Sequence, residues 1–581
     1  MHLHWREYFR LLSIYLRPQS RQIAGLSALL LLGLTLQLIN PQIIRYFIDS
    51  ATHGGTENSL KVAALLFVLC ALAQQTLNAA ANYSAQRIGW LATNRLREDL
   101  SDHCLRLDMS FHNSMTSGAI IERVDGDVSR LFNFFSTLAI RLISSALLAI
   151  AILALLFRED WRLGIAFGAL TSLSAFGLFR IRKLAEPHWV ALREMESAFY
   201  GFLGEQLSNT EGIRSCGATT YVIQRFYTII AKWLPLEVSA RLYSAYMWMV
   251  SGGAFALGNI VTFSLGAYLF ATETITIGTV FLIFNYAQML QAPLESFGDH
   301  VAELPEISAC ITRINAIMRS QSNIVDGKEP PLSSRPAGVT FNQICFAYHP
   351  KRDVLRDVTF NLEPGEVAGV IGRTGSGKTS LARLLLRLYD AQSGTIRIGN
   401  RELQDIPIAS LRDQVALVTQ DVQLFEGSIR DNITFFNRMI SDSEITHALE
   451  NLGLSEWCNM RPGGLNALLH GDGESLSAGE AQLLALTRVF LRNPSIVILD
   501  EASSRLDTVS EYHLHIATRR LMKNRTGLII AHRLSTLSFV DTILVLERGQ
   551  VVEYGRESQL RNDPTSRYYL WRSLAQSGLI V

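Results

Sequence analysis

The hydrophobic positions of the chain fall into two patterns, which change near residue 320. Before that point long stretches carry no charged residue, and after it short apolar runs alternate with polar and glycine-rich segments. A helix needs about 20 mostly apolar residues to cross a bilayer, whereas single runs of about 10–14 residues are typical of buried core helices. The first pattern therefore predicts six membrane-spanning helices, at about residues 22–45, 60–86, 134–157, 161–183, 242–271 and 274–298.

The connections after the second and fourth predicted spans are long and keep a helical periodicity. We expect the spanning helices to continue beyond the membrane and to be joined in pairs by short turns near residues 111–117 and 210–219. These turns are the natural points at which a soluble domain would contact the membrane helices.

The second pattern predicts a separate α/β domain, because apolar strands alternate there with amphipathic helices. A segment rich in glycine, proline and serine interrupts all periodicity before it. We therefore place a transmembrane domain at residues 1–320, a linker at 321–337 and the α/β domain at 338–581.

Composition and charge agree with a membrane protein. Of the 581 residues 48% are hydrophobic and only 18% are charged, which is more apolar than an average soluble protein. Lysine and arginine are concentrated in the N-terminal segment and in the second and fourth connections, nineteen against four in the remaining connections. This bias predicts a multi-pass protein of the plasma or inner membrane with both termini in the cytoplasm. The net charge of +1 gives no reason to expect a nucleic-acid partner.

One motif predicts the binding of a nucleoside triphosphate. Gly372-Arg-Thr-Gly-Ser-Gly-Lys-Thr379 fits G-x-x-x-x-G-K-[ST], between an apolar strand and a helix. In such a phosphate-binding loop (P-loop), backbone N–H groups surround the phosphates, the lysine reaches the β- and γ-phosphates and the Thr379 hydroxyl ligates Mg²⁺. The residues expected to bind the nucleotide here are Gly372, Thr374, Gly375, Ser376, Gly377, Lys378, Thr379 and Ser380.

Two further apolar strands end in polar residues suited to phosphate chemistry. The run from Ser495 ends at Asp500 and Glu501. Asp500 is expected to hold Mg²⁺ through oxygen, and Glu501 to orient or deprotonate the attacking water. His532 follows the strand Gly527–Ile530 and is expected to contact the γ-phosphate.

With these motifs in this order, the chain resembles an exporter-type half-transporter of the ATP-binding cassette (ABC) family over nearly its whole length. The resemblance implies that Tyr348 stacks on adenine and that Gln420 contacts Mg²⁺ and takes part in catalysis with Glu501 and His532. It also assigns Leu476–Glu480 to the signature, with Ser477 and Gly479 facing the nucleotide of a partner, and Asp507 to the D-loop. In the membrane domain, Gly118, Arg123 and Asp127 match the motif after the first intracellular turn.

The signature departs from the usual Leu-Ser-Gly-Gly-Gln, because Ala478 and Glu480 replace a glycine and the glutamine. Arg505 likewise replaces the small residue usual in the D-loop. A negative charge near phosphates suggests a tuned or weaker site. The family implies two chains for each pair of ATP sites, and the altered signature leaves a homodimer and a heterodimer open, with a slight preference for the heterodimer.

The resemblance implies ATP-driven export by alternating access, with ATP and Mg²⁺ as cofactors. The sequence favours a hydrophobic or amphipathic cargo, such as a drug, lipid or peptide, because no charged cluster marks the membrane helices. Asn285, Gln288 and Gln291 share one helix face and either line a cavity or bond between helices. The alternatives are a regulatory or weakly hydrolysing subunit of a heterodimer, and an importer with the exporter fold.

Overall fold

The computed structural model describes residue 10 and residues 13–133, 140–293, 304–332, 336–350, 352–469, 476–500, 508–531 and 534–576. The chain divides into two compact units. The first contains Met1–Leu105 and Ser117–Ser320, and the second contains Arg106–Thr116 and Gln321–Val581. The short segment Arg106–Thr116 thus belongs to the same unit as the C-terminal half, although it lies between membrane helices in the sequence.

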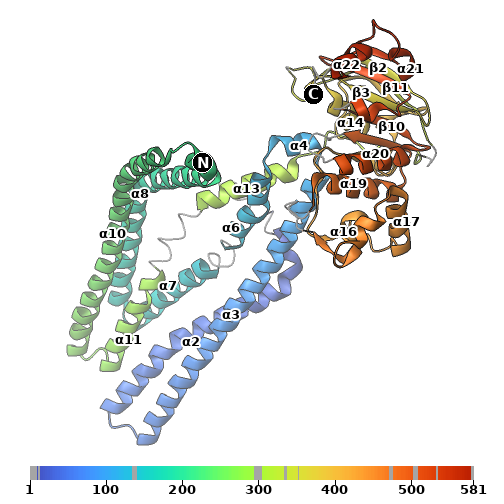
Figure 1. Ribbon diagram of the computed structural model, residues 1–581. Coiled ribbons are helices and arrows are strands. Elements are labelled where there is room, and N and C mark those ends of the chain that lie inside the picture. The colour runs from blue at the N-terminus through green and yellow to red at the C-terminus, as the bar shows by residue number, and fades with distance from the viewer. Residues whose placement is uncertain are drawn as a thin grey trace. The chain divides into compact units, whose positions relative to one another are not determined.

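The first unit is entirely helical in its described part (Figure 1). The long helices are α2 (Ser20–Thr52), α3 (Glu57–Arg106), α7 (Ile140–Glu159), α8 (Trp161–Ser208), α10 (Thr219–Ala271), α11 (Ile277–Met289) and α13 (Leu304–Arg319). Shorter elements are η1 (Arg17–Gln19), α5 (Ser117–Ile121), the π-helical turn η2 (Glu122–Asp127), α6 (Val128–Asn133) and α9 (Thr210–Ser215).

Four described helices are long and apolar enough to cross a membrane: Ser13–Thr52, Glu57–Arg106, Trp161–Ser208 and Thr219–Ala271. The last three have 50, 48 and 53 residues, so at 1.5 Å per residue each is more than twice as long as a bilayer core is thick. This confirms that helices continue beyond the membrane. The third and sixth expected spans contain α7 and α11 and extend into residues 134–139 and 294–303, which lie outside the described part.

The core of the first unit joins its middle helices. Ile152 and Leu156 of α7 pack with Phe167 of α8 and with Leu282 and Tyr286 of α11, and all five are at most 2% exposed. Large apolar side chains elsewhere on these helices are exposed, which suits a surface covered by lipid rather than water. Helices α8 and α10 pack along each other, as Figure 1 shows.

The second unit contains two main sheets. The four-stranded antiparallel sheet has the order β2 (Leu355–Leu362), β1 (Val339–Phe346), β4 (Ser393–Ile398), β5 (Arg401–Glu402). The six-stranded sheet has the order β12 (Gln550–Arg556), β11 (Thr542–Glu547), β3 (Val367–Ile371), β10 (Thr526–Ile530), β9 (Ile496–Asp500), β6 (Val415–Val418). All of its neighbours are parallel except the edge pair β11–β12. A small pair, β7 (Gly427–Ser428) and β8 (Leu468–Leu469), lies apart.

Helices pack around these sheets and complete the second unit. They are α4 (Met109–Ser114), α14 (Lys378–Leu385), α15 (Ile408–Gln414), α16 (Ile429–Thr434), α17 (Asp442–Leu452), α18 (Ser455–Asn459), α19 (Ala478–Arg492), α20 (Thr508–Met522), α21 (Glu557–Leu560) and α22 (Arg567–Gln576), with 3₁₀ turns η4 (Leu403–Asp405), η5 (Gly464–Asn466) and η6 (Leu534–Leu537). The α/β class expected from the sequence is confirmed.

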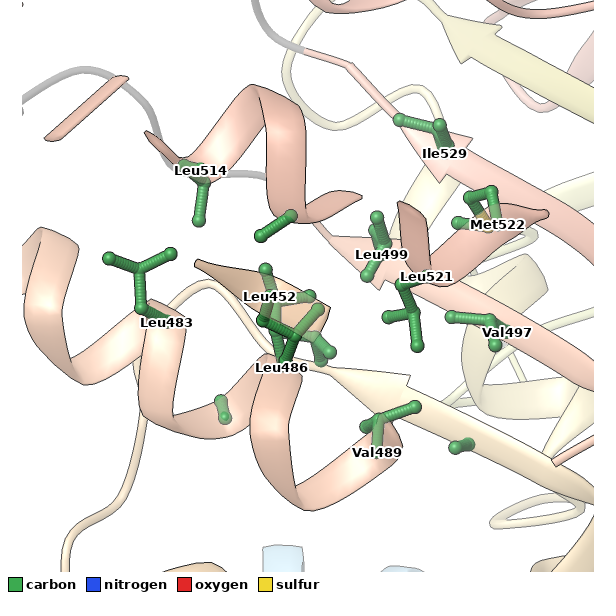
Figure 2. Close-up of a cluster of buried hydrophobic side chains, with 14 of the residues drawn as sticks. Leu452, Leu483, Leu486, Val489, Val497, Leu499, Leu514, Leu521, Met522 and Ile529 are labelled. Atoms are coloured by element: carbon green, nitrogen blue, oxygen red, sulfur yellow. The ribbon is translucent and has the colours of Figure 1, made fainter. Parts of the chain in front are cut away.

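A buried cluster fastens α19 and α20 to the parallel sheet (Figure 2). Leu483, Leu486 and Val489 recur every three residues on one face of α19 and pack with Leu499 of β9 and Leu521 of α20. Burial of each such side chain contributes roughly 1.5–3 kcal/mol. The cluster thus fixes α19 to the sheet from Leu483 onwards.

The short helix α4 corresponds to the first predicted intracellular turn and is bonded within the second unit. Asp108 caps it by accepting hydrogen bonds from Ser110 N and Phe111 N, and Asp108 also accepts one from Asn323 N of the linker segment at 2.6 Å. Asn113 donates to the Tyr389 hydroxyl. The contact expected between this turn and the soluble domain is therefore present.

Candidate nucleotide-binding site

The predicted ATP residues gather at the carboxyl ends of four adjacent parallel strands. The P-loop follows β3, Asp500 is the last residue of β9, and Gln420 comes two residues after β6. Strand β10 lies between β3 and β9. Ligands of open parallel sheets bind at this edge, so the sheet topology brings together residues that are far apart in the sequence.

The backbone of the P-loop depends on glycine. Gly375 and Gly377 have φ of +82° and +105°, a region that other residues rarely adopt. A Cβ at Gly377 would also lie 2.6 Å from Leu355 Cδ2. Gly377 precedes α14 without any side-chain cap, so the first N–H groups of that helix remain available to an anion.

Lys378 is 5% exposed, and its ammonium group turns back onto the loop. Nζ donates to the carbonyl oxygens of Gly372 (2.7 Å) and Arg373 (3.2 Å). Burial lowers the pKa of Lys378, and the nearby Asp500 carboxylate partly opposes this shift. A phosphate would supply the missing negative charge beside this lysine.

The P-loop opens into a cleft of about 1310 Å³, which we call the P-loop cleft. Thr374, Gly375, Gly377, Lys378, Thr379, Ser380, Gln420 and Tyr348 line it, with Arg352, Arg356, Arg383 and Arg548 among the other lining residues. Three aspartates, Asp108, Asp353 and Asp390, also line the cleft, but Lys378 and the four arginines outnumber them, which suits a polyanion. Ser376 Oγ is buried and has no hydrogen-bond partner among the residues that the structure describes, which also fits a phosphate-binding loop.

Tyr348 forms part of the wall of the cleft. Its hydroxyl lies 3.0 Å from Ser380 Oγ and accepts a hydrogen bond from Arg383 Nη1 at 3.1 Å. The ring meets Tyr389 edge to face, with 5.1 Å between the ring centroids. An aromatic wall beside the P-loop is suited to the base of a nucleotide. Sequence reasoning missed Arg383 and Tyr389, because neither belongs to a motif.

The donors expected to bind Mg²⁺ are compatible with that ion. Thr379 and Gln420 line the cleft, and Asp500 is 9% exposed at the end of β9. Hydroxyl, amide and carboxylate oxygens are the hard ligands that Mg²⁺ prefers, usually together with substrate phosphates. The remaining predicted site residues of this group, Glu501, Asp507 and His532, lie outside the described residues.

The signature residues are placed at the start of α19. Ser477 is its N-cap and is exposed, and Gly479 is buried in the first turn. Ser477 Oγ accepts from Glu480 N at 3.3 Å, while Glu480 Oε2 accepts from Ser477 N at 2.8 Å, which makes a capping box. Ala478 is exposed, so its extra methyl group does not disturb the interior.

The other oxygen of Glu480 is bound by two residues that sequence reasoning missed. Glu480 Oε1 accepts from Trp457 Nε1 at 2.6 Å and from Arg461 Nη2 at 2.9 Å. Burial alone would raise the pKa of Glu480, but the hydrogen bonds from Trp457, Ser477 and Arg461 together hold it below its usual range. The carboxylate is therefore ionised and paired within its own chain.

Polar residues of the membrane helices bond either to a neighbouring helix or to a carbonyl of their own helix. Asn40 of α2 donates to Gln74 of α3, and Tyr286 of α11 donates to the Leu38 carbonyl of α2. Asn285 donates to the Phe281 carbonyl of its own helix. For Asn285 this bond is not the expected bond between helices, and the lining of a cavity stays a prediction.

A charged cluster that the sequence did not predict connects the ends of three membrane helices. Arg45 of α2 lies 2.8 Å from Glu159 of α7 and 3.8 Å from Asp49. Asp49 accepts hydrogen bonds from Thr276 Oγ1 and Gly278 N at the start of α11. One arginine faces two carboxylates, so the cluster keeps a net negative charge, and the neutral donors at the start of α11 stabilise the Asp49 carboxylate.

Comparison with known proteins assigns both halves of the chain to protein families. Residues 24–294 match the model of the ABC transporter transmembrane region, and residues 355–504 match that of the ABC transporter. The chain is 32% identical to the "Uncharacterized ABC transporter ATP-binding protein YknV" of Bacillus subtilis, over 96% of this chain and 92% of the relative. It is 30% identical to the "Fatty acid ABC transporter ATP-binding/permease protein" of Mycobacterium bovis, over 87% and 80%.

The fold is similar to a solved structure titled "Structure of a bacterial Atm1-family ABC exporter with ATP bound", with a TM-score of 0.78. The similarity covers 96% of this chain and 98% of that one, at 24% sequence identity.

Proposed function

This chain belongs to the ABC transporter family, and on that basis we propose that it exports a hydrophobic or amphipathic substrate across the plasma membrane. It is a multi-pass membrane protein that couples ATP hydrolysis to transport. The observation that carries the proposal is the P-loop cleft in the same polypeptide as membrane-spanning helices. A lipid-like cargo is supported by the name of the mycobacterial relative, a fatty acid transporter.

In the proposed ATP site, Lys378 and the backbone of the P-loop hold the β- and γ-phosphates, and Tyr348 supports the base. Thr379, Gln420 and Asp500 hold Mg²⁺, which when bound neutralises charge that develops on the phosphates. Glu501 orients the attacking water, His532 contacts the γ-phosphate and Asp507 acts in the D-loop. The positions of Lys378, Thr379, Gln420 and Asp500 at one sheet edge support these roles.

The proposed assembly is a dimer with a second half-transporter chain, because each chain has one P-loop and one signature. Ser477 and Gly479 would face the ATP held by the partner's P-loop. Binding of ATP would favour the closed dimer, and hydrolysis would release it, which alternates access to the cargo pathway. With both termini in the cytoplasm, as the lysine and arginine bias predicts, the ATP sites lie where ATP is available.

The first test is ATP turnover by this chain purified alone in lipid nanodiscs, with Glu501→Gln as the blank. Turnover clearly above the blank means that two copies of this chain suffice. Bound nucleotide without turnover means that a different half-transporter completes the site. Equal turnover by both proteins would contradict the role of Glu501.

Transport direction needs a second measurement. Uptake of a fluorescent fatty acid is followed in sealed vesicles whose ATP-binding units all face outwards, with ATP added outside. ATP-dependent accumulation inside the vesicles supports export, whereas ATP-dependent depletion indicates import.

A further inference from the structure

The glutamate at the end of the signature makes four hydrogen bonds, three of them to its carboxylate and one from its backbone N–H. Two of them form the capping box with Ser477, and the other two come from Trp457 Nε1 and Arg461 Nη2. The side chains of Arg461 and Glu480 are only 27% and 25% exposed. The carboxylate is thus largely withdrawn from water and depends on these partners.

The two donors, Trp457 and Arg461, lie on a separate part of the helical region. Trp457 belongs to α18, and Arg461 follows that helix just before the left-handed turn at Gly463. The Arg461 guanidinium also lies 5.0 Å from the centroid of the Trp457 ring, so the two side chains hold each other in place. The Trp457 ring packs against the core cluster that holds α19.

We propose that Arg461, together with Trp457, is a positioning residue for the Ser477–Glu480 signature: it neutralises Glu480 and directs its carboxylate into the capping box. Ser477 Oγ then acts as acceptor for Glu480 N and keeps its own proton, which can be donated to a phosphate of the partner's ATP. The glutamate is therefore an integral part of a working signature and not a charge that opposes the nucleotide. This inference rests on the proposed function for its effect on turnover, but not for its effect on the start of α19.

The geometry distinguishes this proposal from general structural support by Arg461. If Arg461 acts through the charge of Glu480, its removal changes amide exchange and ATP turnover only while position 480 is charged. A glutamine at position 480 has one acceptor oxygen, which can close the capping box with Ser477 N although Trp457 then loses its acceptor, and it carries no charge that needs an arginine. If Arg461 only packs on Trp457, its loss has the same effect with either residue.

The experiment is a double-mutant cycle of Arg461→Met and Glu480→Gln in nanodiscs. The first readout is hydrogen exchange at the amides of Ser477 and Glu480 without nucleotide, which follows the capping box directly. The second is ATP turnover at saturating ATP, with nucleotide affinity measured in parallel. Arg430→Met is the matched control, since Arg430 pairs with Asp442 at the start of α17.

We expect R461M to accelerate exchange at both amides and to lower turnover about tenfold, because it leaves a buried charge unpaired. Nucleotide affinity should stay within about twofold, since the P-loop of the same chain is untouched. The double variant and R430M should resemble the parent in both readouts. Equal changes caused by R461M in the parent chain and in the E480Q background, or no change at all, would overturn the proposal.

The two readouts also separate this inference from the proposed function. If the parent chain alone shows no turnover, self-sufficient hydrolysis by two copies fails. The exchange cycle then still decides whether Arg461 positions the signature, because it needs neither nucleotide nor a partner.

Discussion

The two helix starts expected to contact ATP phosphates are built in opposite ways. Helix α14 begins after Gly377, which has positive φ and provides no side-chain cap. Helix α19 begins at Ser477 with a complete capping box and a further pair of residues behind it. The P-loop thus leaves the first amides of its helix without a side-chain acceptor, while in the signature side chains satisfy the amides of Ser477 and Glu480.

Because of this contrast, the P-loop and the signature tolerate substitutions differently. An uncapped helix start binds an anion only if the backbone before it keeps its conformation. In the P-loop that conformation has positive φ, which glycine adopts at low cost. A side-chain cap can be rebuilt by another acceptor of similar length. Glutamate therefore replaces the usual glutamine in the signature without loss of the cap, provided that its charge is neutralised nearby.

The largest effect should come from removing the charge of the P-loop. We expect Lys378→Ala to weaken ATP binding on the order of 100-fold, because truncation of a buried charge that binds a phosphate costs about 2–5 kcal/mol. Equilibrium titration with a fluorescent ATP analogue measures this without any need for turnover. Arg397→Ala, which removes an exposed arginine paired with Glu402 on another sheet, should bind like the parent. Unchanged affinity in the Lys378 variant would contradict the assigned site.

The backbone of the P-loop can be tested with two glycines of one loop. Gly377→Ala should destabilise the chain by about 2–4 kcal/mol, since positive φ and a Cβ close to Leu355 both oppose it. Gly375→Ala has positive φ but no atom within 4 Å of its Cβ, so we expect only about 1–2 kcal/mol. Thermal unfolding of both variants checks the order. A more stable Gly377 variant would show that the loop geometry is not constrained in this way.

The signature should show a loss of turnover without a loss of affinity. We expect Ser477→Ala to remove about 1 kcal/mol of helix stability and to lower turnover roughly tenfold, because a donor to the partner's phosphate is lost. ATP affinity should be unchanged. Ser441→Ala is the matched control, since Ser441 caps α17 with the same kind of box, formed with Glu444. A similar loss of turnover in both variants would mean that only helix stability matters.

The smallest effect should be a pH dependence confined to the signature. The pKa of Glu480 is below its usual range in the folded chain. Its contribution to stability is therefore complete above the pKa of the unfolded chain, about 4.3, and is lost as the pH falls through the folded value. We expect a loss of about 1 kcal/mol or less. Exchange at the Ser477 amide between pH 7 and pH 3.5, corrected for the intrinsic rate, measures it.

Glu480→Gln is the control for that series, because its cap has no carboxylate to titrate. The same pH dependence in both proteins would assign the effect to another group. The P-loop helix has no side-chain cap and should show no such change over this range.

Much of the fold and of the ATP site could be predicted because the signals are local. The strand before the P-loop, the strand ending at Asp500 and the strand from Thr526 to Ile530 are each a continuous apolar run. The continuation of α3, α8 and α10 beyond the membrane was predicted from their periodicity. The roles of Glu501, Asp507 and His532, the domain boundaries and the total of six spans stay predictions.

Partners separated in sequence could not be predicted. Arg461 and Glu480 lie on different elements, and no spacing rule connects them. Asn113 and Tyr389 are 276 positions apart. The packing of helices and sheets brings such residues together. A local sequence pattern contains one residue of the pair but does not identify its partner.

Hydrophobic periodicity and glycine positions are signals that act within one element. They were enough to predict the membrane character of the first half, the α/β class of the second half and the phosphate-binding loop. The neutralisation of Glu480 by Arg461 and Trp457, and the particular partners of the short helix after α3, Asn323 and Tyr389, depend on tertiary packing. The physical reason is that a charge is stable in a partly buried place only when the fold brings a partner to it, and the sequence near that charge does not contain the partner.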